Sequence, residues 1–293
     1  MQPTKKSVSL VLGSGGARGL AHIGVIRWLE ENNYEIKSIA SCSIGSLIGG
    51  AYALGKLDVL EQWMCSITKS DILSLLDVSW DGSGLFKGDK MIETLTGLIG
   101  NVQIEDLPIP YTAVAADVES EKEVWINSGS LFQAIRASVS LPLFFTPVDY
   151  NGIKLIDGGV LNPVPIAPTF GDDTDLTIAV NLGGLPMKID APNSIIEEKS
   201  NASFQSIIND FVQNLKLKNN AVSAQSWGMY TVADKAFDAM QSTIARQKLA
   251  AYPPDIEIEI PRNACGTLEF ERSAEMIQFG YQKAKEYSEK SGK

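Results

Sequence analysis

Histidine is almost missing from this sequence, since His22 is the only one among 293 residues, and cysteine is limited to Cys42, Cys65 and Cys265. The cysteines lie far apart and show no Cys-x-x-Cys spacing, so with a single histidine they provide no ligand set for a structural zinc. We therefore expect no metal site and no cofactor. An odd number of cysteines in a chain with a large expected core also fits a reducing compartment.

Positive charge is scarce as well. The chain carries 25 Lys and Arg against 35 Asp and Glu, a formal net charge of -10. A surface that binds nucleic acid must neutralise phosphates with basic side chains, so this composition argues against nucleic acid as a partner. It also argues against electrostatic docking on anionic lipid. Any contact with a membrane surface is therefore expected to be apolar and transient.

Long apolar runs are absent too, because no stretch approaches the ~18 residues that a bilayer-spanning helix needs. The run after Lys5 and Lys6 briefly resembles a signal peptide, but Gly13-Ser14-Gly15-Gly16 and then Arg18 interrupt it, which indicates a strand and a loop. We expect a cytoplasmic protein with one domain over residues 1–293 and a helical C-terminal portion from about residue 195.

Strand and helix patterns alternate along the first half of the chain. A β-rich run at 7–12 leads through glycines into helical recurrence from Leu20 to Leu29, and a second strand at 36–42 leads into a helix over 45–54. This order is typical of a parallel sheet wrapped by helices and predicts an α/β fold. Similar patterns predict helices over 90–99, 130–137 and 204–215, and strands over 111–118, 124–126, 153–156 and 176–181, with another near Val148.

The C-terminal part shows two further patterns. Residues 255–260 alternate strictly between acidic and apolar side chains, which predicts a half-solvated strand at a sheet edge. Ser273 is expected to cap a final helix that runs through Tyr287. The polar stretch 188–201 is the best candidate for a mobile excursion from the fold.

The first motif that could carry chemistry is the glycine-rich loop from Gly13 to Gly19. Such a loop directs several backbone N–H groups toward one point beside the positive end of a helix, and so can bind an anion. A dinucleotide site would also need an acidic residue about 20 positions later, at the end of the second strand. That strand ends in Ser41, Cys42 and Ser43, and no Gly-Lys-Ser/Thr follows the glycines, so we expect no nucleotide. A plain tight turn is the alternative.

The second motif is a serine among small residues where the second strand gives way to a helix. A nucleophile elbow is a sharp strand–turn–helix junction that lifts a serine hydroxyl clear of the backbone. The residues two positions away must be very small, a condition that Ser41 and Gly45 satisfy. Ser43 is therefore the candidate nucleophile. A helix-capping role for Ser43 and Cys42 as a rival nucleophile are the alternatives.

The third motif, Asp157-Gly158-Gly159, directly follows a predicted strand. Glycines after an aspartate let the chain turn sharply and bring the carboxylate close to another backbone, although a plain turn is the alternative. The carboxyl ends of parallel strands meet at one edge, where ligands bind in open α/β sheets. We therefore expect the glycine loop, Ser43 and Asp157 to converge at that edge.

The single histidine bears on the chemistry as well. A Ser-His-Asp triad needs a histidine, and His22 lies in the first predicted helix beside Ile23, which indicates a packed helix residue. The proton of Ser43 must then pass to another base, and a carboxylate is available. Because an aspartate with an ordinary pKa of ~4 is a weak base toward serine, a buried setting and an oxyanion hole would have to assist it.

Taken together, these residues resemble the patatin-like phospholipase family, whose motifs are a GxGxxG loop, a GxSxG elbow and a DG[AG] turn. Ser14 and Ser41 stand where that family has glycines. The similarity covers residues 7 to about 183 and is weaker through the C-terminal helices. Further segments that look like the compact bacterial branch are Leu20-Ala-His-Ile-Gly-Val-Ile26, Gly84-Leu-Phe-Lys-Gly88, Asp106-Leu-Pro-Ile-Pro110, Ala134-Ile-Arg-Ala-Ser138 and Asp157-Gly-Gly-Val-Leu-Asn-Pro-Val-Pro165.

The resemblance implies a three-layer α/β/α fold with a mainly parallel central sheet. It implies a lipid acyl-ester hydrolase of the phospholipase or lysophospholipase kind, with a Ser43–Asp157 dyad and an acyl-serine intermediate. Its partner would be a lipid or acyl-ester substrate, and residues 141–147 could line an acyl channel, face a membrane or pack in the core. A catalytically weak binding or regulatory protein and an acyltransferase are the alternatives. The implied oxyanion donors are backbone N–H groups of Gly15, Gly16, and Ala17 or Arg18.

Overall fold

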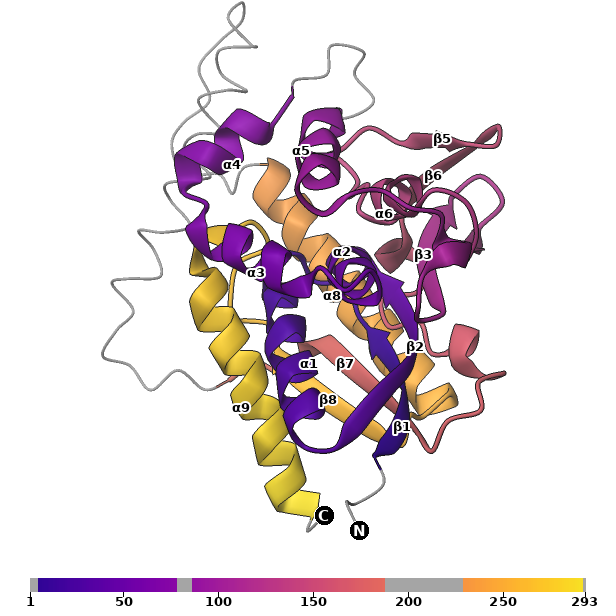
Figure 1. Cartoon of the computed structure of the whole chain (residues 1–293). Coiled ribbons are helices and arrows are strands. Elements are labelled where there is room, and N and C mark those ends of the chain that lie inside the picture. Colours follow the sequence, from indigo (N-terminus) through magenta and orange to yellow (C-terminus); the bar gives the residue numbers. More distant parts are fainter. Residues whose placement is uncertain (1–4, 78–85, 188–228, 292–293) are drawn as a thin grey trace, which may run out of the picture.

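A mixed β-sheet forms the centre of the molecule (Figure 1). The computed structural model describes residues 5–77, 86–187 and 229–291. Within them an eight-stranded sheet has the order β5-β6-β3-β2-β1-β7-β8, with β4 paired to β3. The pairs along β3-β2-β1-β7-β8 are parallel, whereas β4, β5 and β6 form antiparallel pairs. The strands are β1 (Lys6–Leu12), β2 (Tyr34–Cys42), β3 (Tyr111–Asp117), β4 (Lys122–Ile126), β5 (Val148–Tyr150), β6 (Ile153–Asp157), β7 (Leu176–Gly184) and β8 (Ile256–Pro261).

Helices flank this sheet, and α1 and α9 lie side by side in extensive contact (Figure 1). No helix in the described ranges is long and apolar enough to span a bilayer. Short 3-10 turns join several elements, among them η1 (Gly16–Leu20), which contains Arg18, and η3 (Gly158–Val160), which follows Asp157. The helices are α1 (Ala21–Glu31), α2 (Ile44–Ala53), α3 (Leu57–Ser66), α4 (Lys69–Leu75), α5 (Asp89–Ile99), α6 (Leu131–Ser138), α8 (Met229–Ala251) and α9 (Ser273–Ser291).

The two faces of β1 show how the sheet is covered. Val8, Leu10 and Leu12 are fully buried in the larger core, which includes side chains of α1, α2 and α9. Val11 belongs to a second cluster, which it forms with Ala245 of α8. Because successive side chains point to opposite faces of a strand, helices pack on both faces. The predicted α/β/α arrangement with a mainly parallel sheet is therefore confirmed.

Strands β2 and β6 both pair with β3, and their registers bring the C-terminal ends of β2 and β6 close together. Parallel β2 pairs with β3 as far as Cys42 opposite Val114. Antiparallel β6 ends with Asp157 opposite Ala115, the next residue of β3. The sequence argument for this meeting was wrong in one respect: β6 does not share a parallel edge with β2. Its antiparallel direction brings its C-terminal end to the C-terminal end of β2.

The predicted strands in the described ranges are confirmed with ends shifted by at most three residues, and the strand predicted over 255–260 is β8, the last strand in the sheet order. Helices α3 and α4 were not predicted, and α8 lies in the predicted helical C-terminal portion without having been predicted individually. Ser273 begins α9 but does not cap it as expected, because its hydroxyl donates to the Phe270 carbonyl at 2.5 Å. The helix predicted over 204–215 and the stretch 188–201 lie outside the described residues, and the single-domain organisation stays a prediction.

Candidate active site

Ser43 is the single residue between the end of β2 and the start of α2. Its backbone has φ 56° and ψ -126°, a region that residues other than glycine rarely adopt. Strained residues of this kind persist only where the surrounding structure holds them, and they cluster at functional sites. The strand–turn–helix junction therefore has the geometry of a nucleophile elbow, as the sequence predicts.

The small neighbours of Ser43 are required by the packing of this turn. A Cβ added at Gly45 would collide with the backbone carbonyl of Leu12 at the end of β1. Ser41 is fully buried, and its hydroxyl donates to the Thr112 carbonyl at 3.0 Å. Neither Ser41 nor Ser14 has a positive φ. The two serines that replace the family's glycines therefore cause no backbone strain.

A buried hydroxyl in α6 holds the elbow in place, and sequence reasoning did not single it out. Ser138 Oγ accepts a hydrogen bond from the Ser43 N–H at 2.9 Å and donates to the Val114 carbonyl at 2.6 Å. It also lies 2.7 Å from the hydroxyl of Ser46 in the first turn of α2. Ser138 and Ser46 are fully buried. In the sequence, Ser138 stood out only as the last residue of the 134–138 segment that resembles the family.

Asp157 contacts the candidate nucleophile directly. The Ser43 hydroxyl donates to Asp157 Oδ2 at 2.5 Å, and the other carboxylate oxygen accepts from the Gly159 N–H at 2.7 Å. Burial raises the pKa of the fully buried Asp157 to about 7, although both hydrogen bonds act in the opposite direction. The lack of a Cβ at Gly158 matters here, because one would collide with the Val114 carbonyl. The carboxylate is thus a stronger base than an exposed aspartate, and it is poised near neutral pH.

Cys42, the rival nucleophile, is placed differently. It is fully buried, and its Sγ lies 4.0 Å from Asp157 Oδ1. Burial raises the pKa of its thiol well above the usual value, and the nearby charges of Asp157 and Glu123 raise it further. Because the thiolate is the reactive form of cysteine, this position disfavours Cys42 as a nucleophile.

His22 contacts the glycine loop and not the serine hydroxyl. Its Nε2 lies 2.9 Å from the Gly13 carbonyl oxygen, so this nitrogen carries the proton and donates. Burial lowers the pKa of His22 to about 4, with the bond to Gly13 as a smaller opposing effect. A neutral, fully buried imidazole therefore supports the loop as a packed helix residue.

One of the predicted backbone donors of the glycine loop already has a partner. The Ala17 N–H, one of the predicted oxyanion donors, donates to the Thr267 carbonyl at 2.9 Å, so it is not available for an anion. The N–H groups of Gly15 and Gly16 have no such loop or turn partner among the described residues. Gly16 has φ 58°, and a Cβ there would collide with the Thr267 carbonyl. Gly15 and Gly16 therefore remain candidate donors, and the Arg18 N–H, the predicted alternative to that of Ala17, stays a prediction.

Arg18 braces this loop from within the protein and is not a solvated residue at a helix start. Its side chain is buried, and its guanidinium donates to the carbonyls of Arg262 at 3.0 Å and Cys265 at 3.4 Å. It also forms an ion pair with Asp238 of α8. Its side chain thus joins the loop to two C-terminal segments.

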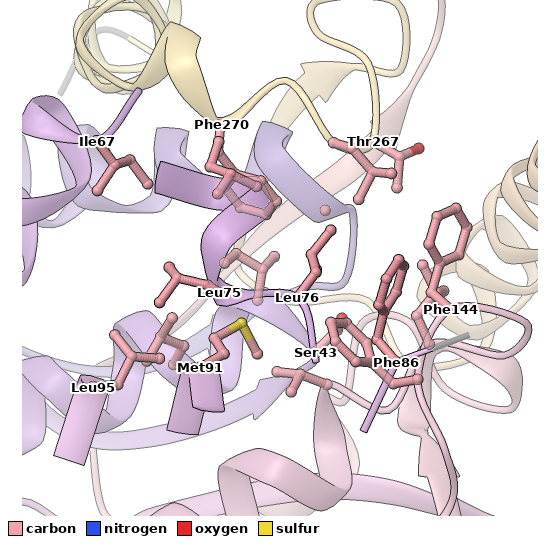
Figure 2. Close-up of a pocket in the computed structure, with 18 of the residues that line it drawn as sticks. Ser43, Ile67, Leu75, Leu76, Phe86, Met91, Leu95, Phe144, Thr267 and Phe270 are labelled. Atoms are coloured by element: carbon pink, nitrogen blue, oxygen red, sulfur yellow. The ribbon is translucent and has the colours of Figure 1, made fainter. Parts of the chain in front are cut away.

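An apolar cavity of about 140 Å³ opens at Ser43. Figure 2 shows Ser43 beside Phe86 and Phe144, with Ile67 and Leu95 at the opposite side of the cavity. Leu141, Phe144 and Phe145 all line it, so the 141–147 segment contributes to the cavity wall. Apart from Gly16, Ser43 and Thr267, every described lining residue has an apolar or aromatic side chain: Ile44, Leu47, Trp63, Met64, Ile67, Ile72, Leu75, Leu76, Phe86, Met91, Leu95, Val139, Leu141, Phe144, Phe145, Leu268 and Phe270.

The site thus combines a strained serine, a buried carboxylate, a glycine loop and a cavity suited to an alkyl chain. Among the described residues, no group of three or more His, Cys, Asp or Glu could hold a metal ion. Hydroxyl, base and apolar wall together can accommodate an acyl ester, with its carbonyl carbon near Ser43.

Comparisons with known proteins identify relatives of this chain. The family model described as patatin-like phospholipase matches residues 10–170. An uncharacterized NTE family protein of Mycobacterium tuberculosis is 38% identical, over 93% of this chain and 89% of that protein. A lysophospholipase of Pyricularia oryzae is 28% identical, over 97% of this chain and 18% of that protein. Among solved structures, VipD from Legionella pneumophila shares the fold with a TM-score of 0.51 at 15% identity, over 98% of this chain and 67% of that chain.

Proposed function

The chain belongs to the patatin-like phospholipase family, and from this premise we propose that it is a lipid acyl-ester hydrolase with a Ser43–Asp157 dyad. One observation carries the proposal: the 2.5 Å hydrogen bond to a fully buried carboxylate from Ser43 Oγ, whose residue lines an apolar cavity. The relatives named as phospholipase and lysophospholipase support the same class of substrate.

In the first half of the proposed reaction, Ser43 Oγ attacks the ester carbonyl carbon while Asp157 accepts the hydroxyl proton. The negative charge that develops on the carbonyl oxygen is stabilised by the N–H groups of Gly15 and Gly16. An oxyanion-hole donor of this kind typically contributes roughly 3–4 kcal/mol to transition-state stabilisation. Collapse of the tetrahedral intermediate breaks the ester bond, and the proton on Asp157 passes to the departing alcohol.

In the second half, water attacks the acyl-Ser43 ester. Asp157 takes a proton from that water, and returns it to Ser43 Oγ when the fatty acid departs. The raised pKa of Asp157, about 7 because of burial, suits a group that gains and loses a proton in each cycle. The reaction as written needs no metal, nucleotide or other cofactor.

The apolar cavity is the proposed binding site for the acyl chain. Its wall near the nucleophile is formed by Phe86 and Phe144 (Figure 2). Burial of the chain stabilises the complex by about 0.8 kcal/mol per methylene group. The polar part of a lipid substrate would remain outside this wall. Because Ser14 and Ser41 fit without strain, the proposal favours an active enzyme over a catalytically weak binding protein.

Hydrolysis of a p-nitrophenyl acyl ester, measured with wild type, Ser43→Ala and Cys42→Ala, tests the proposal. We expect a burst of chromophore followed by steady turnover in wild type and in Cys42→Ala. Ser43→Ala should lose both phases. Product analysis on a lysophospholipid should then find free fatty acid. Turnover that survives Ser43→Ala and disappears in Cys42→Ala would overturn the assignment of the nucleophile.

A further inference from the structure

Two polar side chains that the dyad does not explain, those of Gln241 and Ser14, lie around Gly159 near the Asp157 carboxylate. A Cβ built on Gly159 would collide with the Gln241 side-chain nitrogen, would lie 2.6 Å from Ser14 Oγ, and would lie 3.0 Å from Asp157 Oδ1. The side chains of Gln241 and Ser14 therefore lie near the oxygen of Asp157 that Ser43 does not contact. Glycine at 159 leaves room for this arrangement.

Gln241 and Ser14 form a buried pair. Gln241 Nε2 donates to Ser14 Oγ at 2.9 Å, and each residue is only 7% exposed. The Ser14 N–H donates in turn to the Pro163 carbonyl at 2.8 Å. A buried amide that lost its hydroxyl partner would be left as an unsatisfied polar group, which is unfavourable. The pair therefore fixes the position of Ser14, immediately before the candidate oxyanion donors.

Helix α8 holds both ends of the glycine loop. Asp238 and Gln241 are three residues apart and so lie on the same face of α8. Asp238 forms an ion pair with Arg18 at the C-terminal end of the loop, while Gln241 binds Ser14 at its N-terminal end. The family-model match ends at residue 170, so this helix lies beyond the matched segment.

We propose that Gln241 is a positioning residue for the reaction: through Ser14 it holds the Gly15–Gly16 donors in register with the Ser43–Asp157 dyad. The inference rests on the proposed hydrolase function. Gln241 does not line the apolar cavity, so its loss should spare the binding of the acyl chain. Misplacing a catalytic group by ~1 Å can cost about 10²-fold in rate. The effect should therefore appear in kcat and not in KM.

The experiment is a double-mutant cycle with Gln241→Leu, Ser14→Gly and the combined variant. Fluorophosphonate titration counts competent sites in each preparation, so that kcat refers to folded enzyme. We expect each single variant to lose about 10- to 100-fold in kcat with KM within about threefold. The combined variant should be no worse than the poorer single variant, because residues that act as one unit are non-additive. Gln247→Leu is the matched control, since Gln247 is exposed on the same helix, and it should keep wild-type kcat.

The contrary outcomes are distinct. Losses that multiply in the combined variant would mean that Gln241 and Ser14 act independently, which overturns the proposal. An unchanged kcat in Gln241→Leu, with or without a lower melting temperature, would reduce the pair to a structural contact. Both results need an active wild type. A wild type that neither hydrolyses the ester nor reacts with fluorophosphonate would overturn the proposed function, and with it this inference.

Discussion

Asp157 is a carboxyl group whose burial favours its neutral form. Its pKa in the folded chain is about 7, against an ordinary value of 3.8, so the unfolded state holds the proton less tightly. The native state therefore becomes less stable as pH rises between these two values, and the penalty is constant above the higher one. Asp157→Asn removes the base and this penalty together. We expect turnover to fall by at least about 10³-fold, while the melting temperature at pH 8 is unchanged or higher.

A steady-state assay and a thermal melt on the same preparation check this expectation. If Asp157 were only a turn-forming residue, the outcome would be reversed. Activity per folded molecule would persist and the melting temperature would fall, because the bond from the Gly159 N–H would be weakened.

The pH dependence of kcat/KM separates Asp157 from His22. Because the base must be ionised, kcat/KM should rise with pH and level off above about 7, the pKa that burial gives Asp157. Burial lowers the pKa of His22 to about 4, so the titration of His22 should not produce this acidic limb, the rise of kcat/KM between acidic and neutral pH. His22→Gln should therefore keep the limb and most of the turnover. An acidic limb that vanished in His22→Gln, with a loss beyond about 10³-fold, would reinstate a histidine base.

The sequence singles out the candidate site residues but not their surroundings. Ser43 and Asp157 stand out because their neighbours must be glycine or another small residue. The occupation of the Ala17 N–H could not be predicted, since its partner Thr267 is 250 positions away in the chain and carries no motif. The Gln241–Ser14 pair could not be predicted for the same reason, because a single glutamine in a helix belongs to no motif that would indicate its distant partner.

Helix α6 contributes to the elbow through one buried hydroxyl. Ser138→Ala would leave the Ser43 N–H and the Val114 carbonyl without this partner in a buried site. We expect the free energy of unfolding to fall by roughly 1–3 kcal/mol, the cost of an unsatisfied buried polar group. Urea titration of Ser138→Ala beside Ser128→Ala measures this, because Ser128 is exposed and its variant should stay within about 0.5 kcal/mol of wild type. Equal midpoints for the two variants would contradict the bracing role.

Among the secondary-structure elements, regular buried strands were easiest to predict because their apolar runs are short and end in glycine or polar residues. Helices α3 and α4 are separated only by Ile67 and Thr68, and their periodicity was missed. The direction of β6 was also not predictable, because a strand's sequence does not indicate whether its partner is parallel. That direction nevertheless decides the site, since it brings Asp157 to the end of β2.

At the scale of the whole molecule, the apolar cavity extends from Ser43 to side chains of α3 and α5. The length of this cavity should limit the length of the acyl chain that the protein accepts. Ile67 lies across the cavity from Ser43 (Figure 2). Ile67→Trp should shorten the accessible space and lower kcat/KM for a long-chain p-nitrophenyl ester by roughly 10-fold or more relative to a butyrate ester. Ile153→Trp is the control, because Ile153 is 43% exposed and does not line the cavity. An unchanged chain-length profile in Ile67→Trp would show that the acyl chain binds elsewhere.

The most direct test of the dyad is the mass of a covalently trapped enzyme. A fluorophosphonate should add to Ser43 Oγ, and fragmentation of the tryptic peptide 38–56 distinguishes Ser43 from its other serines and from Cys42. We expect one adduct, on Ser43, in wild type, and a strongly slowed adduct in Asp157→Asn, because the hydroxyl then lacks its base. An adduct on Cys42 or on another serine, or labelling of Asp157→Asn at the wild-type rate, would contradict the dyad.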